Sequence, residues 1–248
     1  MLTLNRFAAG FLLSSVALLP CLAEYEWPQW RGPDRDDISE EGGLLSTWPD
    51  GGPARSWIFK DCGVGYAGPA IIDGKMYIMG GRQDRTQLLC LDAASGEEQW
   101  ASDLAEIYEN NWGDGPRSTP TIDGDRIYTV TSDGTLTCSQ ISDGSKVWSA
   151  SLTELGGKIP TWGYSESPLI YQDMLLCTPG GEPGTIAALD KNTGEVLWRS
   201  SDITDNAHYS SIVTMDVGDE TIGIQLLEHQ LVGFDLSDGK ILWSESWP

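Results

Sequence analysis

Basic residues and histidines are scarce in this 248-residue sequence. It has 15 lysines and arginines against 37 aspartates and glutamates, for a formal charge of −22, and only two histidines. A surface this acidic repels the phosphate backbone of nucleic acids and the anionic surface of a membrane. We therefore expect no nucleic-acid partner and no docking on anionic lipid.

The common signatures of catalytic sites are also missing. There is no G-x-S-x-G segment for a serine nucleophile, and His208 and His229 stand isolated in the sequence. The acidic turns lack the spacing of a calcium-binding loop. Gly180 and Gly181 lie in a predicted strand-to-strand loop, whereas a phosphate cradle needs a strand-to-helix junction. No common template therefore identifies an enzyme.

Long apolar runs are limited to residues 7–19, which are preceded by Arg6 and followed by Cys21-Leu22-Ala23. This run is shorter than the ~20 residues that span a bilayer. A basic start, a short apolar run and a small-x-small end predict a secretory signal peptide over residues 1–23, and hence a periplasmic or secreted protein with no membrane span. The alternatives are a membrane anchor and a lipoprotein lipidated on Cys21, although Pro20 does not suit the latter.

Cysteines are few, and four would remain after such cleavage: Cys62, Cys90, Cys138 and Cys177. An oxidising compartment permits a disulfide, but the wide spacings resemble no metal-binding knuckle. Cys90 and Cys138 occupy equivalent positions in two copies of a repeat. We expect mostly free, buried thiols.

Glycine, proline and tryptophan are abundant, with 29, 13 and 11 residues, which is typical of many short strands and turns. One segment recurs four times, as CLDAASGEEQW (90–100), CSQISDGSKVW (138–148), ALDKNTGEVLW (188–198) and GFDLSDGKILW (233–243). The copies align on Trp100, Trp148, Trp198 and Trp243, on Gly96, Gly144, Gly194 and Gly239, and on Asp92, Gln140, Asp190 and Asp235. The tryptophans are 48, 50 and 45 residues apart. Such a period predicts a β-propeller.

A second hairpin precedes each copy, at residues 68–80, 119–130, 167–178 and 211–225. The first two have Asp-Gly turns between alternating apolar strands, a strong hairpin signal. Two hairpins per repeat make a four-stranded blade, so we predict four blades at about 65–103, 116–152, 164–200 and 208–246. The glycine allows a positive φ, the aspartate can accept turn N–H groups, and the indole is expected to fill the space between blades.

The pattern A-x-D-x-x-[TS]-G-x-x-x-W resembles the tryptophan-docking repeat of the PQQ-type (pyrroloquinoline quinone repeat) β-propeller family. Residues 188–198 match it fully, and residues 138–148 depart from it most. WPQWRGPDRD (27–36) is similar to the opening of exported bacterial proteins that carry these repeats. The resemblance covers about residues 54–246 and implies an all-β propeller of four-stranded antiparallel blades.

Propellers of this family usually have eight blades, about twice the number predicted for residues 61–248. Within an N-terminal arm at 24–60, residues 54–59 (ARSWIF) resemble the last strand of a preceding blade, because Trp57 precedes Trp100 by 43 residues. Three arrangements are open. The chain is a fragment of a longer propeller, which we favour, or two copies complete a ring as a homodimer, or four blades close compactly.

The loops entering the innermost strands are expected to gather at one mouth of a central channel. They carry the candidate binding residues Tyr66, Arg117, Trp162, Tyr164, Glu166, His208 and Tyr209, with Trp112 just upstream in the same connectors. Aromatic rings beside charged groups suit a pocket for a planar or anionic ligand. The alternative is that these groups satisfy buried backbone at a crowded axis.

The resemblance implies either of two functions. Members that use PQQ have an adjacent Cys-Cys pair, a calcium ion held by Glu and Asn, and a catalytic Asp. This sequence has no Cys-Cys pair, and no Asn or Asp accompanies Glu166 in the other channel loops. We therefore assign no catalytic or metal-binding residue and expect no cofactor. We interpret the chain as a non-enzymatic interaction or scaffold module, or a fragment of one, with a protein partner or small ligand at a propeller face. The alternative is a PQQ- and Ca²⁺-dependent alcohol or sugar dehydrogenase, or a fragment of one.

Overall fold

The computed structural model describes residues 26–247, which form sixteen β-strands joined by turns and loops. The predicted signal peptide at residues 1–23, together with Cys21, lies outside the described residues. The strands make four separate four-stranded sheets, each antiparallel throughout. The predicted all-β class with four-stranded blades is therefore confirmed. Within residues 26–247 no helix has the length and apolarity needed to cross a membrane.

Each sheet is built from four strands that are consecutive in the sequence. The first contains β1 (Ala70–Ile72), β2 (Lys75–Arg82), β3 (Arg85–Asp92) and β4 (Glu98–Glu106). The second contains β5 (Thr121–Asp123), β6 (Arg126–Val130), β7 (Thr135–Gln140) and β8 (Lys146–Ser151). The third contains β9 (Leu169–Tyr171), β10 (Met174–Cys177), β11 (Ala187–Asp190) and β12 (Val196–Arg199). The fourth contains β13 (Val213–Val217), β14 (Glu220–Leu226), β15 (Gln230–Asp235) and β16 (Ile241–Ser246).

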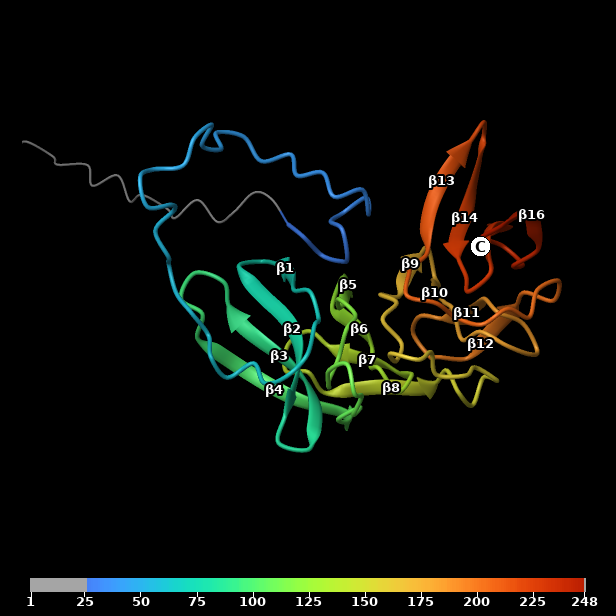
Figure 1. The fold of residues 1–248 in the computed structure, drawn as a ribbon, viewed down its shortest axis with the longest axis horizontal. Helices are drawn as coiled ribbons and strands as arrows, with labels where there is room; N and C mark the ends of the chain where they lie inside the picture. The colour runs from blue at the N-terminus through green and yellow to red at the C-terminus, as the bar shows by residue number, and fades with distance from the viewer. Residues whose placement is uncertain (1–25, 248) are drawn as a thin grey trace, which may run out of the picture.

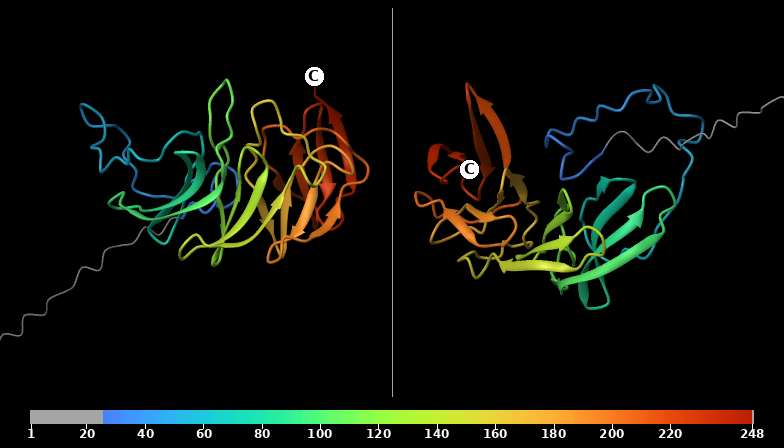
Figure 2. Two further views of the ribbon diagram at one scale, coloured as in Figure 1. Left: turned by 90° about the horizontal axis from the view of Figure 1, so that it is seen from below. Right: turned by 180° about the vertical axis from the view of Figure 1, so that it is seen from behind.

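The four sheets follow one another along an open arc, with the first and last sheets at its two ends (Figures 1 and 2). Strands β1, β5, β9 and β13 lie on the inner side of the arc, and β4 and β8 lie on its outer side (Figure 1). The arrangement is that of a partial propeller. The compact four-bladed ring is not formed, because the turn between successive sheets does not bring the fourth sheet back to the first.

The hydrophobic core lies between successive sheets and is built from cross-strand rows of side chains. In the first sheet this row is Ala70, Tyr77, Cys90 and Trp100. The matching rows are Thr121, Tyr128, Cys138 and Trp148 in the second sheet, and Leu169, Leu176, Ala188 and Trp198 in the third. Apart from the tryptophans, every member is buried. The first row packs on Ile122 and Ile127 of the second sheet, so the second sheet covers the first row.

The tryptophan of each row lies against a glycine turn in the following sheet. A Cβ atom added to Gly144 would lie 2.6 Å from the Trp100 ring, and one on Gly194 would lie 2.6 Å from the Trp148 ring. Trp198 contacts Gly239 in the same way. Only glycine suits these turns, because φ is between +72° and +77° and the indole leaves no room for a side chain.

Trp57 makes the equivalent contact with Gly96, where an added Cβ would lie 2.5 Å from the indole. Its indole N–H also donates to the carbonyl of Ala93, at 3.0 Å. Residues 54–59 nevertheless form no strand, and among residues 26–247 no strand pairs with them. The tryptophan thus has the position expected of a preceding blade, without that blade's structure.

The N-terminal arm crosses the inner edge of all four sheets. Trp27 pairs with Ile71 through two backbone hydrogen bonds of 2.8 Å, and the Ile122 amide donates to the carbonyl of Pro28, at 2.9 Å. Further along the arm, Arg35 is almost fully buried and reaches the entry loops of the third and fourth sheets. The arm therefore ties together the inner side of the arc.

The cysteines and the aspartates of the repeat behave as the sequence predicts. The four cysteines in the described residues are unpaired, and all but Cys62 are fully buried. The Asp92 carboxylate accepts the amides of Ala94 and Ser95, at 3.1 and 2.8 Å, and Asp190 and Asp235 make equivalent bonds. These bonds satisfy turn amides that the hairpin leaves free.

Candidate functional site

Three of the predicted channel residues come together at one cavity. The Trp162 ring stacks on the Tyr209 ring with centroids 4.9 Å apart and planes 28° apart, and the His208 ring lies 4.4 Å from Tyr209. The cavity beside them has a volume of about 370 Å³, and Lys158 and Glu228 also line it. The connectors that enter the third and fourth sheets supply these rings, which is why residues 46 or more positions apart meet.

Trp112 extends this cluster toward the first sheet. Its ring meets Trp162 edge to face, with centroids 6.4 Å apart. The Tyr66 hydroxyl donates to the Trp112 carbonyl at 3.4 Å, and the Arg117 guanidinium lies 5.3 Å from the centre of the Tyr66 ring. We call Tyr66, Trp112, Trp162, His208 and Tyr209 the aromatic surface.

Arg117 supports the aromatic surface rather than presenting a free charge. Its guanidinium donates to the carbonyls of Gly113 and Gly115, at 2.6 and 2.7 Å. These bonds hold the loop that carries Trp112. A second loop contact, from the Asn110 side chain to the Thr161 carbonyl at 2.8 Å, joins the Trp112 loop to the Trp162 loop. The aromatic rings are therefore held on fixed loops.

Tyr164 and Glu166 do not reach this surface. Both are almost fully buried, with exposed fractions of 1% and 2%. The Tyr164 hydroxyl donates to the carbonyl of Pro179, at 2.8 Å, and burial raises the pKa of Tyr164. Glu166 accepts the Thr178 amide on Oε2 and the Thr178 hydroxyl on Oε1, at 2.6 and 2.8 Å. Both side chains satisfy buried polar groups, which is the alternative that the sequence left open.

Glu166 nevertheless has unusual electrostatics. Burial raises its pKa from 4.5 to about 7, although the hydrogen bonds from Thr178 and the positive charge of Arg35 oppose this rise. Burial also lowers the pKa of Arg35 to about 10. A carboxyl group in this environment binds a proton near neutral pH.

The donor set around Glu166 does not fit a calcium-bound quinone. Calcium takes six to eight oxygen ligands, and both Glu166 oxygens are already bonded to Thr178. The Trp162 and Tyr209 rings stack on each other, so one face of each ring is not available to stack on a flat cofactor. The residues of this chain that the structure describes therefore do not assemble the quinone site expected for the alternative function.

The structure also brings together a group of possible metal ligands that the sequence did not predict. Asp205, Glu228 and His229 bring their ligand atoms within 4.8 Å of one another, the one such group found among residues 26–247. His229 Nδ1 already bonds Asp205 Oδ1 at 2.8 Å, and this bond raises the pKa of His229. Burial favours a higher pKa for Asp205, but the bonds from His229 and Asn206 hold it below its usual value. No sequence spacing indicates this cluster, because Asp205 comes from a different connector.

Comparison with known proteins identifies similar chains. A family model described as outer membrane protein assembly factor BamB matches residues 65–248. The quinohemoprotein alcohol dehydrogenase ADH IIB of Pseudomonas putida is 28% identical over 142 residues, which are 54% of this chain and 19% of that protein. The outer membrane protein assembly factor BamB of Marinobacter adhaerens is 24% identical over 129 residues, 52% of this chain and 27% of that one. The chain thus spans about a quarter or less of the curated relatives it matches.

Solved structures show the same fold. BamB from Moraxella catarrhalis superposes with a TM-score of 0.51 at 22% identity, over 74% of this chain and 53% of that chain. Quinohemoprotein alcohol dehydrogenase from Comamonas testosteroni superposes with a TM-score of 0.55 at 16% identity, over 75% of this chain and 35% of that chain. At these identities the likeness shows the propeller fold alone.

Proposed function

The chain belongs to the PQQ-type β-propeller family described as outer membrane protein assembly factor BamB, and we propose that it is an exported, non-enzymatic module that binds a protein partner. Its site of action is periplasmic or extracellular. This location rests on the signal-peptide pattern at residues 1–23 and on the similarity to an outer membrane protein assembly factor.

The aromatic surface is the observation that carries this proposal. The exposed fractions are 64% for Tyr66, 76% for Trp112 and 43% for Trp162. Large aromatic side chains are enriched at protein interfaces, where they supply much of the binding free energy. Because their loops are already fixed by hydrogen bonds, little conformational entropy is lost when a partner binds.

A quinoprotein alcohol or sugar dehydrogenase, or a fragment of one, is the second candidate. The similarity to a quinohemoprotein alcohol dehydrogenase over 142 residues favours it. The hydrogen-bonded state of Glu166 and the lack of a Cys-Cys pair oppose it. Reduction of an artificial electron acceptor by the chain with PQQ, Ca²⁺ and an alcohol or sugar would favour this candidate.

The test replaces Trp112 and Trp162 together by alanine in a tagged chain and measures co-purifying envelope proteins by quantitative mass spectrometry. The matched control is V147A/L197A, because both residues are 40% or more exposed on outer strands. We expect W112A/W162A to lose at least one protein that the wild type and the control both retain. Identical sets of proteins for all three chains would refute the proposal.

A further inference from the structure

Asp205, Glu228 and His229 place three potential metal ligands together where the third and fourth sheets meet. Asp205 lies in the connector that leads from β12 to β13, whereas Glu228 and His229 lie in the turn between β14 and β15. The cavity beside Asp205 and His229 has a volume of about 500 Å³. Ile203 and Ile241 also line this cavity, and both pack in the core between the third and fourth sheets. The group is therefore flanked by two described sheets and does not lie on the outward face of the fourth sheet.

Asp205 is held in a fixed position and faces the turn that carries His229. Its side chain is only 8% exposed. Its backbone carbonyl accepts the Gly181 amide and the Thr185 hydroxyl, both at 2.8 Å. Its carboxylate accepts the His229 amide on Oδ2 at 3.0 Å, and Oδ1 lies 2.8 Å from His229 Nδ1. A buried carboxylate fixed in this way is a preorganised ligand, which a mobile surface acid is not.

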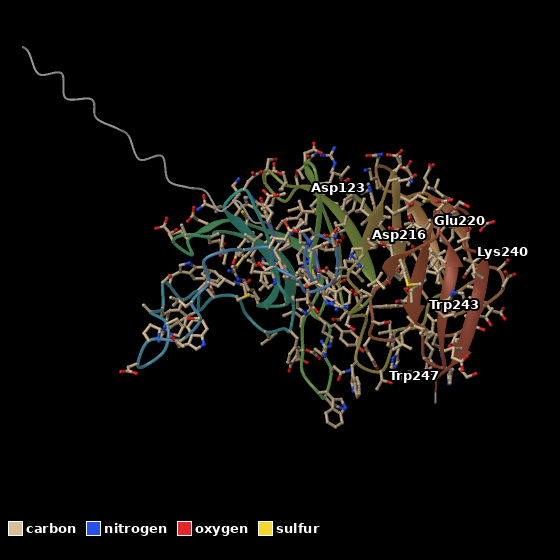
Figure 3. All side chains as sticks on the ribbon, turned by 90° about the horizontal axis from the view of Figure 1, so that it is seen from above. Asp123, Asp216, Glu220, Lys240, Trp243 and Trp247 are labelled. Carbon is tan, nitrogen blue, oxygen red and sulfur yellow. The ribbon has the colours of Figure 1, made fainter. Side chains whose placement is uncertain are left out.

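Hydrogen bonds also fix the turn that carries Glu228 and His229. Glu228 Oε2 accepts the side-chain amide of Asn206 at 2.5 Å. The His229 carbonyl accepts the Trp247 amide at 2.7 Å, and Figure 3 shows Trp247 at the lower end of the fourth sheet, away from Glu220. The side chains of His229 and Glu228 are 71% and 42% exposed. An ion from solvent can therefore reach ligands whose backbone is already in place.

The distances and the ligand types suit a small divalent transition-metal ion. Zn²⁺ binds histidine nitrogen and carboxylate oxygen at about 2.0–2.2 Å in a tetrahedron, which places neighbouring ligand atoms about 3.3–3.5 Å apart. His229 Nδ1 lies 2.8 Å from Asp205 Oδ1 and 3.9 Å from Glu228 Oε2. Shifts of about half an ångström give the tetrahedral spacing. Ca²⁺ and Mg²⁺ take oxygen ligands, so the imidazole disfavours them.

We propose that Asp205, Glu228 and His229 bind one Zn²⁺ ion, with water in the fourth position. The ion replaces the proton that His229 Nδ1 donates to Asp205 Oδ1, and this proton passes to solvent. The adjoining cavity has room for the water. None of the ligands belongs to the aromatic surface or to the group around Glu166, so the inference goes beyond the proposed function.

Nuclear magnetic resonance of the histidines tests the site directly, because the chain has only two of them. The untagged chain is labelled with ¹⁵N-histidine and titrated with Zn²⁺ in excess Mg²⁺, which occupies weak sites on the acidic surface. His208 is the internal control, because it lies against Tyr209 and outside the ligand group. We expect the imidazole signals of His229 alone to shift, with saturation at one ion per chain. No shift of His229, or equal shifts of both histidines, would overturn the proposal.

Two substitutions at exposed positions assign the ligands while leaving the buried Asp205 in place. Isothermal titration calorimetry with Zn²⁺ compares H229Q and E228Q with the wild type, and circular dichroism checks that each chain is folded. We expect both variants to bind at least about tenfold more weakly, because loss of even a supporting residue costs about 10–100-fold in metal affinity. The matched control E220Q, at the exposed far end of β14, keeps the wild-type affinity. Wild-type affinity in H229Q, or an equal loss in E220Q, would contradict the proposal.

Discussion

Arg35 is the residue on which the inner side of the arc converges. Its guanidinium donates to the carbonyls of Ser167 and Ile212, at 3.2 and 2.8 Å, and to the carbonyl of Pro168. Its Nε donates to the Gln29 side chain at 2.8 Å. A buried cation is costly unless its donors are satisfied, so these bonds decide whether the arm stays in place.

We predict that R35M, which keeps the volume but loses the donors, lowers the free energy of unfolding by about 2–4 kcal/mol, because several buried carbonyls lose their partner. Urea unfolding followed by circular dichroism measures this loss. The control R55M, at an exposed position, should stay within about 0.5 kcal/mol of the wild type. A loss at Arg35 as small as that at Arg55 would show that the arm does not stabilise the arc.

Glu166 predicts a pH dependence of stability. Its pKa is about 7 in the folded chain and 4.5 as the reference value, so between these values the folded state holds a proton that the unfolded state releases. The Glu166 contribution is therefore fully present below pH 4.5 and is lost as the pH rises through 7. From pH 5 to 8 the stability of the wild type relative to E166Q should fall by about 2–3 kcal/mol.

Urea midpoints of both chains across this pH range test the prediction. The difference between the chains isolates Glu166 from the other acidic groups. A difference that is constant with pH, or one that grows as the pH rises, would mean that Glu166 is not protonated in the folded state.

Sequence position predicted that the candidate residues lie in the loops that enter the innermost strands, but not how buried each side chain is. Tyr164 and Glu166 stand within five residues of Trp162, yet their side chains point into the core while Trp162 is exposed. This distinction depends on Thr178 and Pro179, which the β9–β10 hairpin brings back alongside the entry loop. No local pattern encodes such contacts.

At the scale of the element, the glycine turns join one sheet to the next. Gly194 combines a φ of +77° with the Trp148 ring, whereas Gly124 has a φ of +57° and nothing within 4 Å of an added Cβ. Comparing an alanine substitution at Gly124 with one at Gly194 therefore separates two costs. The first is the strain of a positive φ, and the second is the clash of the new side chain with the indole.

We predict that G194A destabilises the chain by about 2–4 kcal/mol and G124A by about 1 kcal/mol, because only the former adds a clash to the backbone strain. Chemical unfolding of the two variants side by side measures the difference. Equal costs would indicate that the indole moves away freely and that its contact with Gly194 contributes little.

The strands were predictable because the repeat imposes one register on four units, with tryptophan, glycine and aspartate at fixed spacing. The arm was not predictable in the same way. Arg35 bonds residues 132 and 177 positions away, and its segment has no strand periodicity. Only the assembled inner edge of the sheets gives the arm its place.

At the scale of the whole molecule, the sequence predicted the number of blades. It did not predict the curvature of the arc that the four sheets form. Figure 2 shows the four sheets as an arc with separated ends. Its curvature depends on the side chains packed between sheets, such as Tyr77 and Trp100, whose rings lie 5.9 Å apart. The described residues thus form an arc of four sheets that carries an aromatic surface on its loops.

The central claim is that the aromatic surface contacts a protein, and photo-crosslinking tests it most directly. A benzophenone amino acid placed at Trp112, which is 76% exposed, is irradiated in intact cells, with the same group at Val147 as the control. We predict a discrete adduct with another protein from position 112 and none from position 147. The absence of an adduct at 112, or equal adducts from both positions, would contradict the account.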